Sequence, residues 1–383
     1  MLAADIGRVL SVVREAAGVT VEDLALTTSL DPLLLGAIER GEELPSTAKL
    51  DRLAAALGLD AFALYEGRQV EHSLLVLPRH AARPDFRDED LAVLRRALER
   101  GTALREVSAI LGQAPTTFEP RAPGAEPAQD GYHWARRVRA ALGNVAKPLD
   151  DVPNLLAEKF HVPVLRVPLA TTGLMAAAVR SSASRAGAVV LNTNVTGGPA
   201  QGTYQAWLVD RVSVSHELCH ILLDEPKEAF DVFLDDPPRE GHDKSAIEQR
   251  AGAFAAELLI PLHGLRELFG DEDRQVATPA AADKMVDEVR SYFRTPAELA
   301  VNHLYNYRYV AQVQAFREQL VERARAREIA APGFVGGQSR GWEAVLVSRT
   351  RAAHNEGLIT DGSARALLEL TAGEPLPWEA EDA

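Results

Sequence analysis

The chain has 383 residues, 46% of them hydrophobic and 25% charged, which is the composition of an ordinary globular protein with room for about two to four domains. The formal charge of −14 argues against a protein whose whole surface binds nucleic acid. The single cysteine, Cys219, and the lack of a signal peptide or a membrane-length apolar run predict a cytoplasmic protein with no membrane partner.

Residues 1–67 are predicted to form an all-α domain of five short helices. Apolar residues recur at helical spacing in each segment, and residues that start or stop helices separate the segments. Thr20 is a suitable N-cap, and Asp31 precedes Pro32, the residue type favoured at the first helical position. The fifth helix is expected at 60–65.

Residues 68–131 are predicted to form a helical connector followed by a proline-rich linker. Helical periodicity covers 86–111, and Gly101 is expected to divide it into two helices because glycine is unfavourable within a helix. Residues 112–131 contain four prolines and no apolar periodicity, which indicates a linker or a long surface loop.

Residues 132–278 mix helices with short strand-like runs, so an α+β domain is expected there. Helical segments are predicted at 134–142, 149–160, 209–223 and 245–260, strands at 161–167 and 188–191, and 175–179 is an ambiguous third strand. Helices dominate 279–330, and 331–383 combine a linker with a last helical pair. The predicted fold class is therefore mainly α with a small β-sheet.

Residues 216–220 read His-Glu-Leu-Cys-His within an apolar helical segment. Positions four apart lie one above the other on a helix, so His216 and His220 can bind one metal ion from one face. Glu217 then lies beside the open coordination position, where a carboxylate can take a proton from water whose pKa zinc lowers to about 7. The motif predicts one zinc ion per chain, with hydrogen-bonded histidines and no metal as the alternative.

The helix predicted at 245–260 offers Glu248 and Glu257 as a third ligand. At about 100° per residue these two glutamates face opposite sides of the helix, so only one can reach the metal. Glu248 shares its face with the small residues Gly252 and Ala255, which permit close helix packing, and it is the predicted ligand. Glu257 is expected to face solvent or to form a salt bridge.

Other polar residues have secondary roles in this interpretation. Asp224, one turn beyond His220, is an alternative ligand or an acceptor that orients a histidine. Cys219 is expected to be a buried packing residue rather than a thiolate ligand. Candidates for stabilising an oxyanion are His263, His303 and Tyr305.

The segments HELCHILLD and IEQRAGAFAAELLIP resemble the paired helices of the ImmA/IrrE family of metallo-endopeptidases. That family joins a His-Glu-x-x-His helix to a Glu-x-x-Ala-Asn-x-Phe-Ala-x-x-Leu-Leu-Met-Pro helix. The positions that match in register are Glu248, Ala251, Phe254, Ala255, Leu258, Leu259 and Pro261. The chain departs from the family pattern at Gly252, Asp224 and Cys219, which replace asparagine, a frequent histidine and a frequent glycine or alanine. The segment LITDGSARALLEL at 358–370 also resembles the closing helical pair of these proteins.

This resemblance, which covers roughly 132–370, implies a zincin-like fold with zinc bound by His216, His220 and Glu248. It also implies that Glu217 is the general base. The implied substrate is a protein, a helix-turn-helix transcriptional repressor whose cleavage releases a stress or mobile-element response.

Three segments of the N-terminal domain resemble the XRE/Cro-like helix-turn-helix family: IGRVLSVVREAAGVT, LLLGAIERGEELPS and LDRLAAALGLD. In that family the third helix reads bases in the DNA major groove. Here the reading positions hold Pro32, Leu33, Leu34 and Leu35, whose side chains form no hydrogen bond with a base edge. The resemblance therefore predicts the fold, and it leaves both DNA and a protein open as partners.

The charge of residues 1–67 also predicts weak DNA binding. Eleven acidic and five basic side chains leave a net charge of −6, whereas DNA affinity comes mainly from Lys and Arg on phosphates. Arginine clusters at 95–105 and 136–139 are expected to be solvated helix faces or local basic patches. A homodimer is also compatible with the sequence.

Two functions from different classes follow. The first is a zinc-dependent regulatory endopeptidase that cleaves a partner protein recruited by the helix-turn-helix domain. The second is an XRE-family transcription factor whose peptidase-like domain acts as a sensor or a protein-binding module without proteolysis. The intact set His216, Glu217, His220 and Glu248 favours the first, because a domain that has lost its activity does not need the base.

Overall fold

The computed structural model describes residues 6–7, 10–11, 14, 19–57, 88–181, 185–224, 230–234, 245–270, 275–327, 341–371 and 374–379. Most of the first predicted helix, the whole of the fifth at 60–65 and nearly all of the linker after 330 lie outside these residues. The chain divides into two compact units: Met1–Phe86 with Arg180–Ala186 and Pro226–Val232, and the remainder. The predicted fold class, mainly α with a small β-sheet, is confirmed.

The N-terminal unit contains α2 (Val21–Thr28), α3 (Pro32–Glu39) and α4 (Thr47–Leu57). The predicted caps form, since the side chain of Thr20 accepts from the backbone N–H of Asp23 and that of Asp31 accepts from Leu33 and Leu34. The buried core of these helices consists of Ile6, Leu10, Leu24, Ala25, Leu35, Ile38, Leu50, Leu53 and Ala54. This apolar set explains why short helices form a stable group.

The described strands form a four-stranded sheet in the order β1-β3-β2-β4. The strands are β1 (Val164–Val167), β2 (Ala176–Ser181), β3 (Gly187–Asn192) and β4 (Phe230–Leu234), and β1 runs parallel to β3. The ambiguous segment 175–179 is thus a strand. Every residue of β2 and of β3 is buried, so both faces of the sheet are covered.

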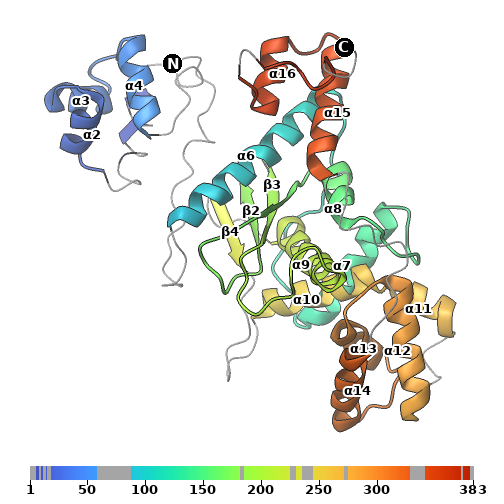
Figure 1. Ribbon diagram of the computed structural model, residues 1–383. Helices are drawn as coiled ribbons and strands as arrows, with labels where there is room; N and C mark the ends of the chain where they lie inside the picture. The colour runs from blue at the N-terminus through green and yellow to red at the C-terminus, as the bar shows by residue number, and fades with distance from the viewer. Residues whose placement is uncertain are drawn as a thin grey trace. The chain divides into compact units, whose positions relative to one another are not determined.

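Helix α6 (Asp88–Ile110) crosses the sheet without a break, so the predicted division at Gly101 is wrong (Figure 1). A Cβ atom at Gly101 would lie 2.3 Å from the carbonyl oxygen of Gly187 on β3. Glycine is therefore required where α6 packs this closely on β3. The close packing outweighs the cost of glycine within a helix, which is about 1 kcal/mol relative to alanine.

Helix α7 (Pro127–Ala141) begins inside the segment predicted to be a linker, with a proline in its first turn. It packs closely on α10 (Ala246–Leu259), where a Cβ at Gly131 would lie 2.3 Å from the carbonyl oxygen of Arg250. The close helix contact predicted at Gly252 is not made there, since a Cβ at that position would meet no atom within 4 Å.

The remaining helices complete the second unit. They are α8 (Val152–Leu155), the π-helical turn η2 (Leu156–Phe160), α9 (Tyr204–Leu223), α11 (Leu262–Phe269), α12 (Pro279–Phe293), α13 (Ala297–Asn306), α14 (Gln314–Ala326), α15 (Gly341–Asn355) and α16 (Asp361–Leu368). Helices α12, α13 and α14 pack together beside α10, and α15 and α16 pack on α6 (Figure 1). Among the described residues, every helix is too short or too polar to cross a membrane.

Candidate metal centre

Helix α9 carries the His-Glu-Leu-Cys-His motif through the centre of the second unit. Thr203 caps the helix by accepting from the N–H of Ala206, and the helix ends before Asp224. Its C-terminal half is surrounded by other elements, so His216, Glu217 and His220 are all buried. Polar side chains placed this deeply require partners, and α10 provides Glu248 as the partner of both histidines.

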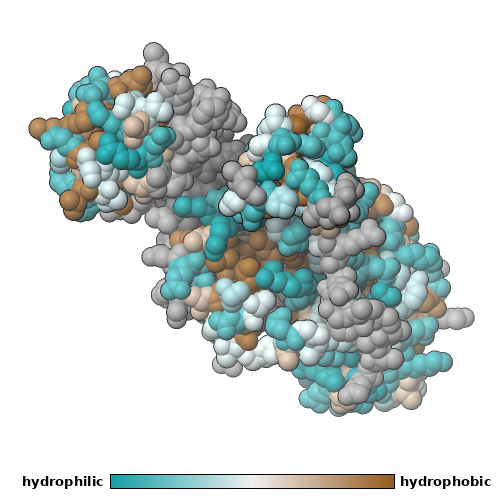
Figure 2. Space-filling view, turned by 45° about the horizontal axis from the view of Figure 1, so that its top comes forward, coloured by the Kyte–Doolittle hydropathy of each residue, from teal (hydrophilic) through white to brown (hydrophobic). Residues whose placement is uncertain are grey.

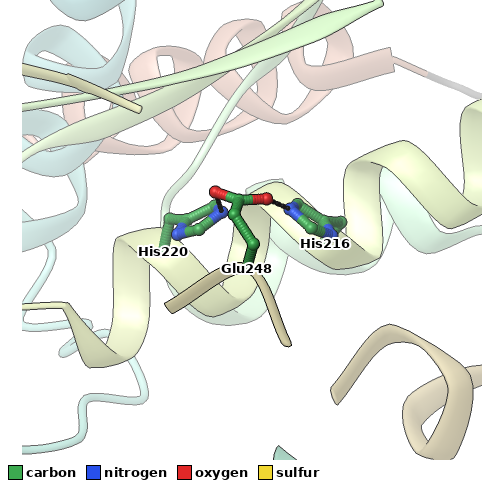
Figure 3. Close-up of side chains that lie close together, drawn as sticks. All are labelled: His216, His220 and Glu248. Atoms are coloured by element: carbon green, nitrogen blue, oxygen red, sulfur yellow. Dashed lines mark hydrogen bonds and ion pairs between the residues drawn. The ribbon is translucent and has the colours of Figure 1, made fainter. Parts of the chain in front are cut away.

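Helix α10 brings Glu248 to the two histidines. The side chain of Ser245 caps the helix by accepting from the N–H of Glu248, which fixes this glutamate in the first turn. Its Oε2 lies 3.1 Å from Nε2 of His216, and its Oε1 lies 3.6 Å from Nε2 of His220. Figure 3 shows both imidazole rings turned toward the Glu248 carboxylate.

The donor set of these three residues fits a zinc ion. One ligand atom from each of His216, His220 and Glu248 lies within 4.8 Å of the others. With metal–ligand bonds of about 2.0–2.2 Å, ligand atoms at the corners of a tetrahedron lie roughly 3.3–3.6 Å apart. The two histidine nitrogens lie at 3.1 and 3.6 Å from the nearer carboxylate oxygen of Glu248, which is similar. Two imidazole nitrogens and one carboxylate oxygen also form a common ligand set of catalytic zinc.

Asp224 orients His220 and does not face the ion site. Its Oδ2 accepts from Nδ1–H of His220 at 2.6 Å, so Nε2 of the ring is the nitrogen directed at Glu248. Its Oδ1 accepts from the guanidinium of Arg250. Of the two roles considered for Asp224, the contacts agree with the acceptor that holds a histidine ring in place.

Arg250 contacts Asp224 behind His220, and the His-Glu-Leu-Cys-His motif did not predict this contact. Its side chain is fully buried, donates to Asp224 and donates to the carbonyl oxygen of Arg121 at 2.8 Å. A buried guanidinium requires a carboxylate partner, and Asp224 supplies it. The only sequence signal is an arginine two residues after Glu248 in an otherwise apolar helix.

Glu217 follows His216 on α9 and is fully buried. Cys219 is also fully buried within the apolar core, and this burial raises the pKa of its thiol. The cysteine is thus a packing residue, as expected, and it is not part of the group formed by the two histidines and Glu248.

Glu257 faces the interior, so the expectation of a solvent-facing side chain is wrong and that of a salt bridge is correct. It lies 2.9 Å from Nε of Arg136, accepts from the hydroxyl of Tyr307 at 2.6 Å and lies 3.4 Å from His303. Burial alone would raise the pKa of Glu257, but these partners hold it below its usual value. This network joins α7, α10 and α13.

The three candidates for oxyanion stabilisation make contacts of other kinds. His303 contacts the carbonyl oxygen of Ile260 at 2.8 Å, in addition to Glu257. The ring of Tyr305 lies under the guanidinium of Arg317, and His263 is exposed on α11. No oxyanion role is assigned to any of them.

Basic side chains in the N-terminal unit are held by acceptors within the unit. Arg14 forms two hydrogen bonds with Glu39, and Arg40 forms two with Glu42. The two other basic residues described between 14 and 57 are Lys49, 3.7 Å from Glu43, and Arg52, which donates to the carbonyl oxygen of Thr28. Between residues 14 and 57, where the structure describes all four basic side chains, few donors are therefore ready to contact phosphate.

Apolar side chains occupy the surface at the start of α3 instead. Leu33, at a position that reads bases in helix-turn-helix proteins, is 83% exposed, and Leu26 on α2 is 82% exposed. Figure 2 shows apolar side chains among polar ones on this unit. A surface of this kind suits contact with another apolar group better than contact with a phosphate backbone.

Of the arginines in the two predicted clusters, Arg139 alone is buried, and Arg96 and Arg137 are exposed. Arg139 is buried and donates to the carbonyl oxygens of Leu258 and Lys147, and burial lowers its pKa to about 10. Arg136 binds Glu257, and Arg100 pairs with Glu369 on the last helical segment. The expectation of solvated faces is therefore wrong for Arg139.

Two family models match the chain. Residues 5–62 match a helix-turn-helix domain, and residues 209–305 match an IrrE N-terminal-like domain. The second range contains the motif on α9 and Glu248 on α10. No match to a curated protein was found. Both family resemblances expected from the sequence are confirmed.

Proposed function

Because the chain joins an XRE-like helix-turn-helix domain to an IrrE-like metallopeptidase domain, we propose that it is a zinc-dependent regulatory endopeptidase that cleaves a partner protein. The observation that carries this proposal is the convergence of His216, His220 and Glu248 from α9 and α10. The domain pair supports a regulator with a peptidase domain, and the three ligand atoms support hydrolysis as its activity.

His216, His220 and Glu248 would hold one zinc ion per chain. A bound zinc ion polarises a peptide carbonyl and lowers the pKa of water to about 7. Asp224 keeps the His220 ring in one orientation, and the guanidinium of Arg250 donates a hydrogen bond to Asp224 from its other side. The chain thus supplies both the ligands and the groups that position them.

Glu217 is the proposed general base. It is adjacent to His216 on α9, and its burial separates the carboxylate from competing solvent. A carboxylate in this position accepts the proton of the attacking water and can return it to the leaving amine. No other acidic residue belongs to the motif on α9.

The proposed substrate is a helix-turn-helix repressor, brought to the peptidase by the N-terminal domain. The test is incubation of the zinc-loaded protein with purified candidate repressors, followed by mass spectrometry of the products. Cleavage at one site that stops when the zinc is removed supports the proposal. Zinc binding without cleavage of any candidate would instead support the transcription factor whose peptidase-like domain acts as a sensor.

Metal analysis gives the first expected result. The purified protein should contain about one zinc ion per chain, and Glu248→Ala should lower its zinc affinity by at least about tenfold because one of three ligands is lost. Inductively coupled plasma mass spectrometry and a competing chelator measure both quantities. Glu288→Ala, at an exposed position of α12, is the control and should bind zinc normally. A protein free of zinc, with hydrogen-bonded histidines, would contradict the prediction.

Weak binding of generic duplex DNA is the second expected result. Nonspecific affinities of such domains are about 10⁻⁴–10⁻⁶ M, and the paired basic side chains predict a Kd of about 10⁻⁴ M or weaker at physiological salt. Fluorescence anisotropy of a labelled duplex, titrated with the full chain and with residues 1–67, measures it. Tight binding with a steep salt dependence would show that DNA, and not a protein, is the partner of this domain.

A further inference from the structure

A cavity of about 200 Å³ lies beside α9, on the N-terminal side of the metal ligands. Four residues of α9 contribute to its wall, Ala206, Val209, Asp210 and Ser213. The opposite wall comes from the end of β3 and from residues of the 195–201 segment. The group formed by the metal ligands does not include any residue of this cavity.

The cavity and the metal ligands share one face of α9. At about 100° per residue, Val209, Ser213, His216 and His220 fall within a sector of roughly 60°. Ser213 precedes His216 by three residues, a rise of about 4.5 Å along the helix axis. A polypeptide bound with its reacting bond at the ligands would therefore place a neighbouring side chain over the cavity.

The wall formed by β3 is held in place by hydrogen bonds. Asn192, which lines the cavity, accepts from the N–H of Leu169 and donates to the carbonyl oxygens of Thr171 and Leu174. Asp90 on α6 binds the same loop, accepting from the N–H groups of Ala170 and Thr171. The loop at 169–174 is thus held from two sides, and its hydrogen bonds fix the side chain of Asn192 at the cavity wall.

The cavity suits an uncharged guest. Its one acidic residue, Asp210, is neutralised by Arg166, whose nitrogens lie 3.0 and 3.2 Å from Oδ2. Met175, Val195 and Val209 supply apolar wall, and the amide of Asn192 is already occupied by backbone groups. The other polar side chains of the wall, Thr193, Gln201 and Ser213, carry no charge. A charged side chain would lose its water here without gaining a partner.

The volume selects the size of the guest. A dry cavity of about 150 Å³ accepts benzene, so about 200 Å³ accepts a ring or a branched aliphatic chain but not an extended segment. We propose that this cavity binds one uncharged side chain of the protein substrate, of leucine to phenylalanine size, next to the bond that is cleaved. This inference rests on the proposed peptidase function.

Two substitutions change the cavity in opposite directions. Ala200→Trp, at an exposed position of the 195–201 segment, should close the cavity without disturbing the core. Val209→Ala should enlarge it. Ala281→Trp, at an exposed position of α12, is the control for adding an indole to the surface. All are made in the full-length, zinc-loaded protein.

The probe is a set of synthetic peptides in which one position carries Gly, Ala, Leu, Phe, Trp, Lys or Glu. Hydrolysis by the active protein is followed by mass spectrometry, and binding to the Glu217→Gln protein by fluorescence anisotropy. The wild type should prefer Leu and Phe over Gly, Lys and Glu by about tenfold or more. Ala200→Trp should shift the preference to Gly and Ala, and Val209→Ala should shift it to Phe and Trp.

The two readouts separate this inference from the proposed function. Hydrolysis with no side-chain preference, or with the same preference in Ala200→Trp as in the wild type, overturns the inference and leaves the peptidase. Binding that shows the expected shifts, without any hydrolysis, supports the cavity and contradicts the peptidase. The inference is also overturned if the peptides show no side-chain preference in binding and none in hydrolysis.

Discussion

Replacing Glu217 by glutamine (Glu217→Gln) is expected to leave zinc bound and to lower the rate of peptide hydrolysis by about 10²–10⁴-fold. The amide has the size of the carboxylate, so the buried position stays filled and the ligands on either side keep their places. An amide cannot accept the proton of the attacking water, however. The loss should therefore appear in kcat, with little change in zinc content or in substrate binding.

The measurement compares initial rates of cleavage with zinc content for the same preparations. Glu288→Gln, the same change at an exposed position of α12, is the matched control and should keep the wild-type rate. A Glu217→Gln protein that cleaves its substrate at nearly the wild-type rate would show that another group is the base. A protein that loses zinc as well would show that Glu217 supports the ligands.

The approach of His216, His220 and Glu248 to one another could be predicted from the sequence because part of its geometry is local. The spacing of His216 and His220 depends only on helix geometry, which an amino-acid pattern specifies directly. Helix rotation also showed that only one of Glu248 and Glu257 can reach the metal, and the small residues on the face of Glu248 decided between them. The structure accordingly brings together the residues that the pattern selected.

Tertiary contacts explain what the sequence did not reveal. Gly101 and Gly131 look like helix breakers in a linear pattern, yet both allow a helix to approach another backbone closely. Glu257 looks like a surface residue until Arg136 and Tyr307 arrive from distant parts of the chain. Each of these roles depends on a partner more than 50 residues away or on another element, which local periodicity cannot specify.

Removing the charge of Asp224 is expected to lower the zinc affinity, although Asp224 is not itself a predicted ligand. In Asp224→Asn the ring of His220 is oriented by a neutral amide instead of a carboxylate, and such neighbours of a metal ligand are worth about 10–100-fold in affinity. The fully buried guanidinium of Arg250 also loses the carboxylate that it contacts most closely, since its other partner, Asp130, lies 3.6 Å away. Breaking a buried ion pair in this way costs about 3–5 kcal/mol of unfolding free energy.

A second substitution distinguishes the two effects of Asp224→Asn. Arg250→Met, added to it, replaces the unpaired charge by an apolar side chain of similar length and should recover much of the lost stability. It should not recover zinc affinity, because the neutral amide still faces His220. Urea unfolding of the metal-free proteins measures stability, and competition with a chromophoric chelator measures the affinity.

The control is Asp150→Asn, which breaks the surface pair between Asp150 and Arg294. Exposed pairs contribute about 0–1 kcal/mol, so this variant should unfold almost as the wild type does and should bind zinc with the same affinity. Wild-type zinc affinity in Asp224→Asn would contradict the role given to the carboxylate. Full recovery of zinc affinity in the double variant would show that Asp224 acts only through the packing of Arg250, because the ring of His220 would then need no charged acceptor.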